Sequence, residues 1–193
     1  GYYVDHAIQT VPLPGLRKGQ NILEIVEPIA EWTNMEWCYL LGDFGVSLEG
    51  TIKTITEPVR NIAFCDYSRQ RLPFYTGNIT WHTELEISDG EEVFVRVPTY
   101  RGALVSILVD GNEVGDIVYS PYCLKLPKLS VGCHKLDFKL YGNRENGFAQ
   151  LHHEKTLKYK KAPNSWRSEE DLWTYEYQLV PMGILKSPEI YKF

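Results

Sequence analysis

The stretch that decides the fold reads Asn78-Ile79-Thr80-Trp81-His82-Thr83-Glu84-Leu85-Glu86-Ile87. From Ile79 onward, apolar side chains or threonine occupy the odd-numbered positions and polar side chains occupy the even-numbered ones. Successive side chains of a β-strand point to opposite faces of a sheet, so a period of two indicates a half-buried strand. The turn-forming run Ser88-Asp89-Gly90 is predicted to end it.

Strand signals continue downstream, and Leu136, Phe138 and Leu140 repeat the period of two. Leu104–Val109 runs into Asp110-Gly111-Asn112 and then into Val114–Tyr119. Asp-Gly between two apolar runs is a strong hairpin signal, so these runs are predicted to pair. Further strands are predicted at residues 93–97, 124–126, 132–140 and 174–180.

Upstream of Asn78 the strand signals are shorter. Strands are predicted at residues 6–11, 21–29, 36–41, 50–56 and 61–67. Helical signal is confined to residues 168–173, where Ser168 can cap a turn and acidic residues suit the positive end of its dipole. Short, regularly spaced strands without long helical periodicity predict an all-β fold, an antiparallel β-sandwich or jelly roll.

A boundary is predicted near residues 57–60, where Pro58 interrupts the strand pattern. Residues 61–193 are then long enough for a complete jelly roll. Residues 1–60 form an N-terminal β segment with too few strands to stand alone. We expect this segment to pack on the main domain or to be part of a preceding sandwich.

Composition excludes several partners. The net charge of −5 gives no long-range attraction for nucleic acid. The lysines at positions 155, 158, 160 and 161 are interpreted as a solvated strand face. No apolar run approaches the length of about 20 residues that a membrane-spanning helix needs.

The four cysteines lie far apart in the sequence, without a Cys-x-x-Cys pair. This spacing disfavours a zinc ribbon or a redox pair. Cys38 and Cys123 fall in strand-like runs and are predicted to be buried free thiols, which favours a reducing, cytoplasmic location.

No catalytic, metal-binding or cofactor-binding residue is predicted. His152 and His153 are adjacent, and adjacent strand residues point to opposite faces, which disfavours a shared metal ion. Nucleophile-elbow and phosphate-binding motifs are absent from the sequence. A pair of glycosidase carboxylates remains open, because its members can be distant in sequence.

The candidate ligand site is a polar loop region that runs from Tyr141 to Gly147 and continues beyond Ala149. Its side chains suit a carbohydrate, which needs planar hydrogen-bonding groups for its hydroxyls and an aromatic face for its C–H surface. The candidate ligand-binding residues are Asn143, Arg144, Asn146, His152, His153 and Trp166. The alternative is that the asparagines hold the turn and Trp166 fills the core.

Several segments together show a resemblance to a known group. They read Tyr39-Leu40-Leu41-Gly42-Asp43-Phe44-Gly45-Val46, Leu72-Pro73-Phe74-Tyr75-Thr76-Gly77-Asn78-Ile79-Thr80, Val109-Asp110-Gly111-Asn112-Glu113-Val114-Gly115, Arg144 through His153, and Tyr177-Gln178-Leu179-Val180-Pro181-Met182-Gly183-Ile184-Leu185. They resemble the ancillary sandwich regions of large bacterial glycoside hydrolases related to glycoside hydrolase family 2 and to α-L-rhamnosidases. The resemblance implies a galactose-binding-like jelly roll, with the catalytic domain of a parent chain as its partner.

Three functions follow as hypotheses. The first is a non-catalytic carbohydrate-binding accessory domain, which requires the candidate side chains to be open to solvent. The second is a structural module for interdomain packing, which requires those side chains to be buried or bonded to their own backbone. The third is a small hydrolase, which requires two carboxylates roughly 5–10 Å apart across a cleft.

Overall fold

The structure is a computed structural model of the chain that describes residues 1–3, 5–31, 38–149, 151–153 and 172–193. The chain divides into two compact units, residues 1–41 and residues 42–193. We call them the N-terminal unit and the sandwich unit and describe each by itself. The boundary predicted near residues 57–60 falls inside the sandwich unit, and the assignment of domains remains a prediction.

The N-terminal unit contains one small hairpin, β1 (Tyr2–Tyr3) with β2 (Asp5–Gln9). The strand predicted at residues 21–29 is wrong, because these residues are not in any strand. Ile22 and Val26 are 87% and 86% exposed. A strand needs a neighbour for its backbone groups, and the described residues of this unit provide none here. At residues 36–41, the described part (38–41) is also not a strand.

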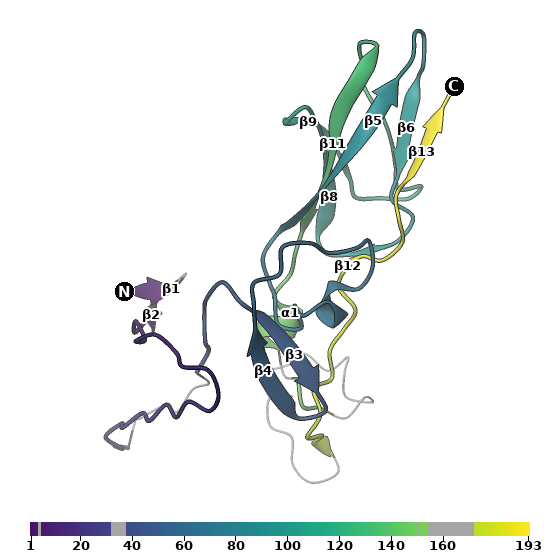
Figure 1. Ribbon diagram of the computed structural model, residues 1–193. Coiled ribbons are helices and arrows are strands. Elements are labelled where there is room, and N and C mark those ends of the chain that lie inside the picture. Colours follow the sequence, from purple (N-terminus) through teal and green to yellow (C-terminus); the bar gives the residue numbers. More distant parts are fainter. Residues whose placement is uncertain (4, 32–37, 150, 154–171) are drawn as a thin grey trace. The chain divides into compact units, whose positions relative to one another are not determined.

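The sandwich unit is built on two antiparallel sheets (Figure 1). The four-stranded sheet has the order β5 (Ile79–Ile87), β11 (Gly132–Tyr141), β8 (Leu104–Val109) and β9 (Asn112–Ile117). The three-stranded sheet has the order β10 (Cys123–Lys125), β6 (Val93–Arg96) and β13 (Glu189–Lys192). Two short pairs complete the unit, β3 (Gly45–Glu49) with β4 (Ile52–Thr56) and β7 (Tyr100–Arg101) with β12 (Gly183–Ile184).

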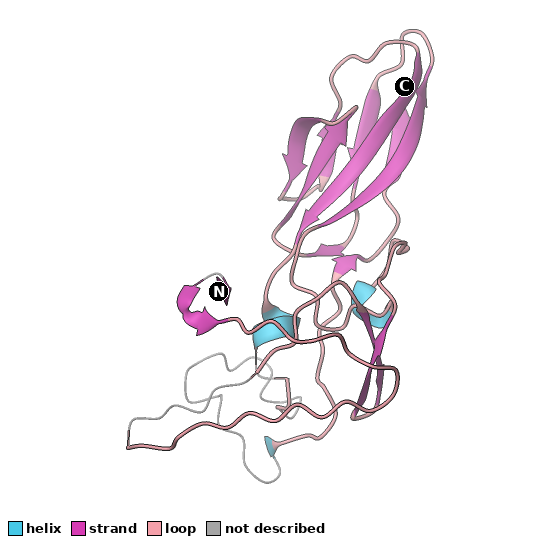
Figure 2. Cartoon of the chain, turned by 60° about the vertical axis from the view of Figure 1, so that its left-hand side comes forward, coloured by secondary structure: helices cyan, strands magenta, loops and turns pink. Residues whose placement is uncertain are grey.

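The predicted all-β class is confirmed. Figure 2 shows the described chain as strands and loops with only short helical turns, which include η1 (Tyr67–Arg69) and α1 (Glu145–Phe148). The arrangement of antiparallel sheets is consistent with the predicted β-sandwich. The finer assignment to a galactose-binding-like jelly roll remains a prediction.

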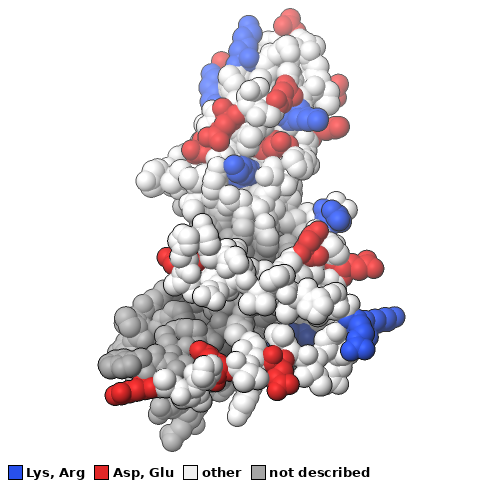
Figure 3. All heavy atoms as spheres, turned by 90° about the vertical axis from the view of Figure 1, so that its left-hand side faces the viewer, with Lys and Arg blue, Asp and Glu red and all other residues white. Residues whose placement is uncertain are grey.

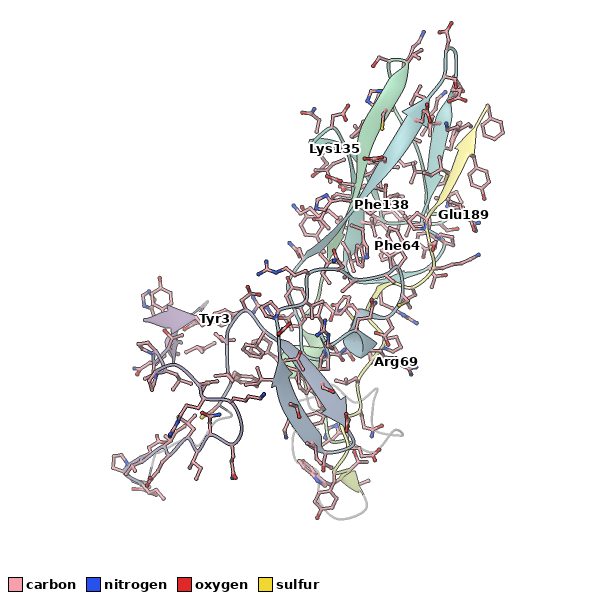
Figure 4. All side chains as sticks on the ribbon, in the orientation of Figure 1. Tyr3, Phe64, Arg69, Lys135, Phe138 and Glu189 are labelled. Atoms are coloured by element: carbon pink, nitrogen blue, oxygen red, sulfur yellow. The ribbon has the colours of Figure 1, made fainter. Side chains whose placement is uncertain are left out.

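The core is made by the inward-facing positions of both sheets, as the period of two predicts. On β5, Trp81, Leu85 and Ile87 are buried, while the even-numbered residues between them are exposed. Figure 4 shows Phe64 close to Phe138, and the two rings make an edge-to-face contact with centroids 5.8 Å apart. Burial of these side chains is the main stabilising contribution to the unit.

Two further predicted strands are wrong. Residues 61–67 form irregular chain that ends in η1, where the Asp66 carboxylate caps the turn by accepting from the Ser68 N–H at 3.0 Å. Residues 174–180 also form no strand. Their backbone donors instead bond to residues 151 and 152, with Gln178 N 2.7 Å from Leu151 O and Thr174 N 2.7 Å from His152 O. The helical turn predicted at 168–173 lies almost wholly outside the described residues.

The prediction of buried thiols is wrong as well. All four cysteines are free and exposed. On β10 it is Leu124 that turns toward the core, so the alternation places Cys123 on the outer side. A strand-like sequence identifies two faces, but it does not say which of them a single small side chain occupies.

Charged side chains of both signs share the surface of the described chain. On the face shown in Figure 3, Lys and Arg side chains are interspersed with Asp and Glu side chains rather than gathered into a basic patch. Within the described ranges, no helix has the length and apolar character that crossing a membrane would require.

Candidate functional site

The loop that follows β11 brings three of the predicted ligand residues to the short helix α1. Asn146 is 1% exposed. Its Nδ2 donates to the Val180 carbonyl oxygen at 2.8 Å, and its Oδ1 accepts from the Val180 N–H at 3.0 Å. Both ends of the amide are therefore bonded to one backbone position, which ties α1 to the C-terminal segment.

The two residues before α1 are exposed. The Oδ1 of Asn143 accepts from the Glu145 N–H at 3.0 Å, and its Nδ2 lies 3.8 Å from the sulfur of Met182. The carbonyl of Arg144 accepts from the Phe148 N–H at 2.9 Å. Asn143 thus holds the start of the helical turn, as an asparagine in this position commonly does.

His152 belongs to a different group of side chains. Its Nδ1 lies 2.9 Å from the Thr174 carbonyl oxygen, so this nitrogen carries the proton and donates. Its ring stacks on Trp173 with centroids 4.6 Å apart and contacts Tyr177 at 4.5 Å. Phe74 makes an edge contact with Tyr177, with ring centroids 5.0 Å apart. We call Phe74, His152, Trp173 and Tyr177 the aromatic cluster.

The aromatic cluster has a cationic neighbour on β4. The Nζ of Lys53 donates to the Tyr177 hydroxyl at 3.0 Å and lies 5.1 Å from the centre of that ring. Lys53, Phe74 and Tyr177 are not among the residues predicted for the site. The predicted strand at residues 174–180 is wrong, and the contacts of Lys53 and Phe74 with Tyr177 join parts of the chain that are far apart in sequence. The one sequence feature that could have indicated this cluster is the high aromatic content of residues 173–177.

The two remaining predicted residues are His153 and Trp166. His153 is 6% exposed, and burial lowers the pKa of its imidazole. Among the described residues nothing bonds to its Nε2, which fits a neutral ring inside the fold. Trp166 lies outside the described residues.

The outer face of the four-stranded sheet carries a second polar group of side chains. They line an open concavity of about 650 Å³ that is formed by His82, Glu84, Asp110, Gly111, Cys133, His134, Lys135 and Asp137. The Nδ1 of His82 lies 2.8 Å from the Asp137 carboxylate across the two neighbouring strands. The alternation on β5 predicted that His82 and Glu84 face outward. Which β11 residues lie beside them could be known only from the register of the two strands.

His134 links the β8–β9 turn to the loop before β11. Its Nδ1 lies 2.6 Å from an Asp110 carboxylate oxygen, and its Nε2 lies 2.9 Å from the Ser130 carbonyl oxygen. Because acceptors face both nitrogens, the charged ring is favoured, and the bond to Asp110 first and that to Ser130 second raise its pKa above 6.5. The bond from His134 likewise lowers the pKa of Asp110 below 3.8.

This pair predicts a pH-dependent contribution to stability. A raised folded-state pKa for His134 means that its contribution is complete below pH 6.5 and is lost as the pH rises through the folded pKa. A lowered pKa for Asp110 means that its contribution is complete above pH 3.8 and is lost as the pH falls further. The difference in unfolding free energy between the wild type and His134→Gln, measured by urea unfolding, should therefore be largest between about pH 3.8 and pH 6.5. A difference that stays constant from pH 5 to about 9 would contradict this assignment.

The described residues offer no metal centre. Within them, no three His, Cys, Asp or Glu side chains are grouped so that they could hold an ion. In the concavity, Asp110 and Asp137 each bond to a histidine rather than standing free across a cleft.

Comparisons with known proteins find distant similarity only. No protein-family model and no curated protein matches the chain. Among solved structures, the chain is similar to a rhamnosidase from Novosphingobium sp. PP1Y, with 13% identity and a TM-score of 0.45 over 78% of this chain and 14% of that one. It is also similar to a GH2 β-galacturonidase from Eisenbergiella tayi, with 22% identity and a TM-score of 0.32 over 50% of this chain and 17% of that one. The chain thus spans only 14% and 17% of these two proteins. TM-scores of 0.45 and 0.32 are too low to support a conclusion about activity.

Proposed function

We propose that this chain is a non-catalytic accessory β-sandwich module of a larger glycoside hydrolase, and that its role there is structural. The link to glycoside hydrolases rests on the resemblance of its sequence segments to the ancillary regions of these enzymes. The structural role rests on one observation, the buried Asn146 amide with both ends bonded to Val180.

The contacts of the loop region support packing over ligand binding. A sugar-binding amide has to present its donors and acceptor to the ligand, and Asn146 is buried with one donor and its oxygen already bonded to Val180. Asn143 likewise accepts from the backbone N–H of Glu145 in its own turn, and His152 bonds to the Thr174 carbonyl oxygen of the C-terminal segment. These bonds join the end of β11, α1 and residues 174–182 into one framework.

The N-terminal unit supports the same role through its exposed apolar side chains. Val11, Ile22, Val26 and Ile29 are each at least 78% exposed. Burial of such side chains against a partner would be favourable, because it removes apolar surface from water. In this proposal the partner is the catalytic domain of the parent chain.

A carbohydrate-binding role is the second candidate, and the aromatic cluster favours it. Tyr175 beside the cluster is 79% exposed, and the Trp173 and Tyr177 rings are half-buried. Aromatic faces and a nearby ammonium are suited to the C–H surface and hydroxyls of a sugar. If the chain binds a carbohydrate, the residues that contact it are those of the aromatic cluster and not Asn146.

Calorimetric titration with L-rhamnose, D-galactose and D-galacturonate separates the two candidates. The structural proposal predicts no saturable heat, which means no binding tighter than a Kd of about 1 mM. Saturable binding that is lost in Trp173→Ala but retained in Asn143→Ala would establish the second candidate and overturn the first. Asn143→Ala is the matched control, because it removes a polar side chain of the same region without touching the aromatic cluster.

A further inference from the structure

β5 is an edge strand of the four-stranded sheet (Figure 1). It pairs with β11 along its whole length, from Ile79 opposite Leu140 to Ile87 opposite Gly132. No described strand pairs with its other side. A long strand with one free side is a template for pairing with another chain.

The backbone bonds of β11 show which groups of β5 face this free side. The Lys135 carbonyl accepts from the Asp110 N–H, and the Tyr141 carbonyl accepts from the Ala103 N–H, so odd-numbered residues of β11 bond toward β8. The register places these odd-numbered residues opposite even-numbered residues of β5, such as Lys135 opposite Glu84. In an antiparallel ladder, those β5 residues direct both N–H and C=O away from β11.

The outward groups of β5 therefore belong to Thr80, His82, Glu84 and Glu86. The Glu86 carbonyl accepts from the Lys192 ammonium, which shields this end of the edge. Within the described ranges, no hydrogen bond takes the backbone groups of the other three residues. The middle of the edge thus presents a row of unpaired donors and acceptors.

The sequence of β5 is complementary to itself when it is read in the opposite direction. We propose that β5 pairs antiparallel with β5 of a second copy of this chain, about a twofold axis at Thr83. This register places His82 opposite Glu84 of the second copy, and Thr80 opposite Glu86. All of these residues direct their backbone bonds toward the new partner, so the ladder can form without disturbing β11. Pairing of Glu86 with Thr80 additionally requires the flexible Lys192 side chain to release the Glu86 carbonyl, whereas the central His82–Glu84 pairs need no such change.

Side chains match on both faces of this pairing. On the outer face, each of the two His82 side chains meets a Glu84 carboxylate, an opposite-charge pair when the ring is protonated and a hydrogen bond when it is neutral. On the core face, Ile79 meets Ile87 and Trp81 meets Leu85 of the second copy. The result is one continuous sheet made from the four-stranded sheets of both copies.

The charges also decide between registers. A shift of the axis by one residue toward Ile79 places His82 opposite His82 of the second copy. The opposite shift places Glu84 opposite Glu84, which is repulsive. The register at Thr83 keeps every residue from Ile79 to Ile87 paired and gives opposite partners on the outer face.

A charge exchange tests both the dimer and its register. Light scattering coupled to size exclusion, and sedimentation velocity, should show the wild type approaching twice the 22.3 kDa of the chain as concentration rises. His82→Glu and Glu84→Lys should each weaken self-association by about tenfold. His82→Glu places two carboxylates opposite each other at both His82–Glu84 positions, and Glu84→Lys removes the carboxylate that His82 of the second copy contacts and puts an ammonium in its place. The double variant restores opposite charges across the axis and should return to within about threefold of the wild type.

Glu84→Pro provides a second, independent test. Proline removes an outward N–H and no bond to β11, so an edge position of this kind tolerates it. It should give a folded monomer, with folding verified by circular dichroism and thermal unfolding. A wild type that remains monomeric up to about 1 mM would overturn the proposal. A dimer whose stability is unchanged in all of these variants would also overturn it. A double variant that remains monomeric, when both single variants are monomeric, would overturn the proposed register.

Discussion

Asn146→Ala is expected to lose about 3 kcal/mol of unfolding free energy. The substitution removes both hydrogen bonds to Val180 and leaves that residue's N–H and C=O without their side-chain partner. It also opens a small cavity at a position that is 1% exposed. Urea unfolding followed by tryptophan fluorescence measures this loss.

The matched control is Asn143→Ala, three positions earlier in the same loop. Asn143 is exposed, and its Oδ1 accepts a single hydrogen bond from the Glu145 N–H. Its loss should cost about 1 kcal/mol or less, in the range of a turn or cap side chain. Equal and small losses in the two variants would show that Asn146 does not hold the framework together.

Gly142→Ala is expected to be the most damaging single-methyl change in the loop region. A Cβ on Gly142 would meet the Gly77 carbonyl oxygen well inside van der Waals distance and would lie 3.3 Å from the Thr76 carbonyl oxygen. Both neighbours are backbone atoms, so no side-chain rotation relieves the contact. We expect a loss of about 3 kcal/mol or more, or failure to fold at 37 °C.

Gly15→Ala is the control for this prediction. A Cβ at Gly15 has nothing within 4 Å, and the residue lies in irregular chain. Alanine there should change stability by less than about 1 kcal/mol, with a small gain from reduced unfolded-state entropy. Thermal unfolding of the two variants side by side gives the comparison. A Gly142→Ala protein as stable as Gly15→Ala would mean that β11 does not end against residues 76–77 as described.

Long strands were predicted from sequence more fully than two-residue ones. β5 and β11 contain enough residues for the period of two to identify a buried face, whereas β8 is identified by its continuous apolar run and the Asp-Gly turn that follows it. β7 and β12 contain two residues each and carry no periodic signal. Residues 21–29 and 174–180 have strand-like composition, yet a strand also needs a neighbour, and local sequence does not supply that information.

The candidate site was harder to predict, because its contacts join distant parts of the chain. Asn146 and Val180 are 34 positions apart, and His82 and Asp137 are 55 apart. Sequence alone identified Asn143 and Asn146 as turn or ligand residues and left both alternatives open. Only the arrangement of the C-terminal segment against α1 shows that the Asn146 amide is bonded at both ends.

The most direct test of this account follows the side-chain amide of Asn146 by NMR during the titration with saccharides. If the loop region is a structural framework, the two Nδ2 protons exchange slowly with solvent, because the group is buried and donates to Val180. Their signals should also stay unshifted as L-rhamnose, D-galactose or D-galacturonate is added. Fast exchange together with saturable shifts of these signals would contradict the account and identify Asn146 as a ligand-binding residue.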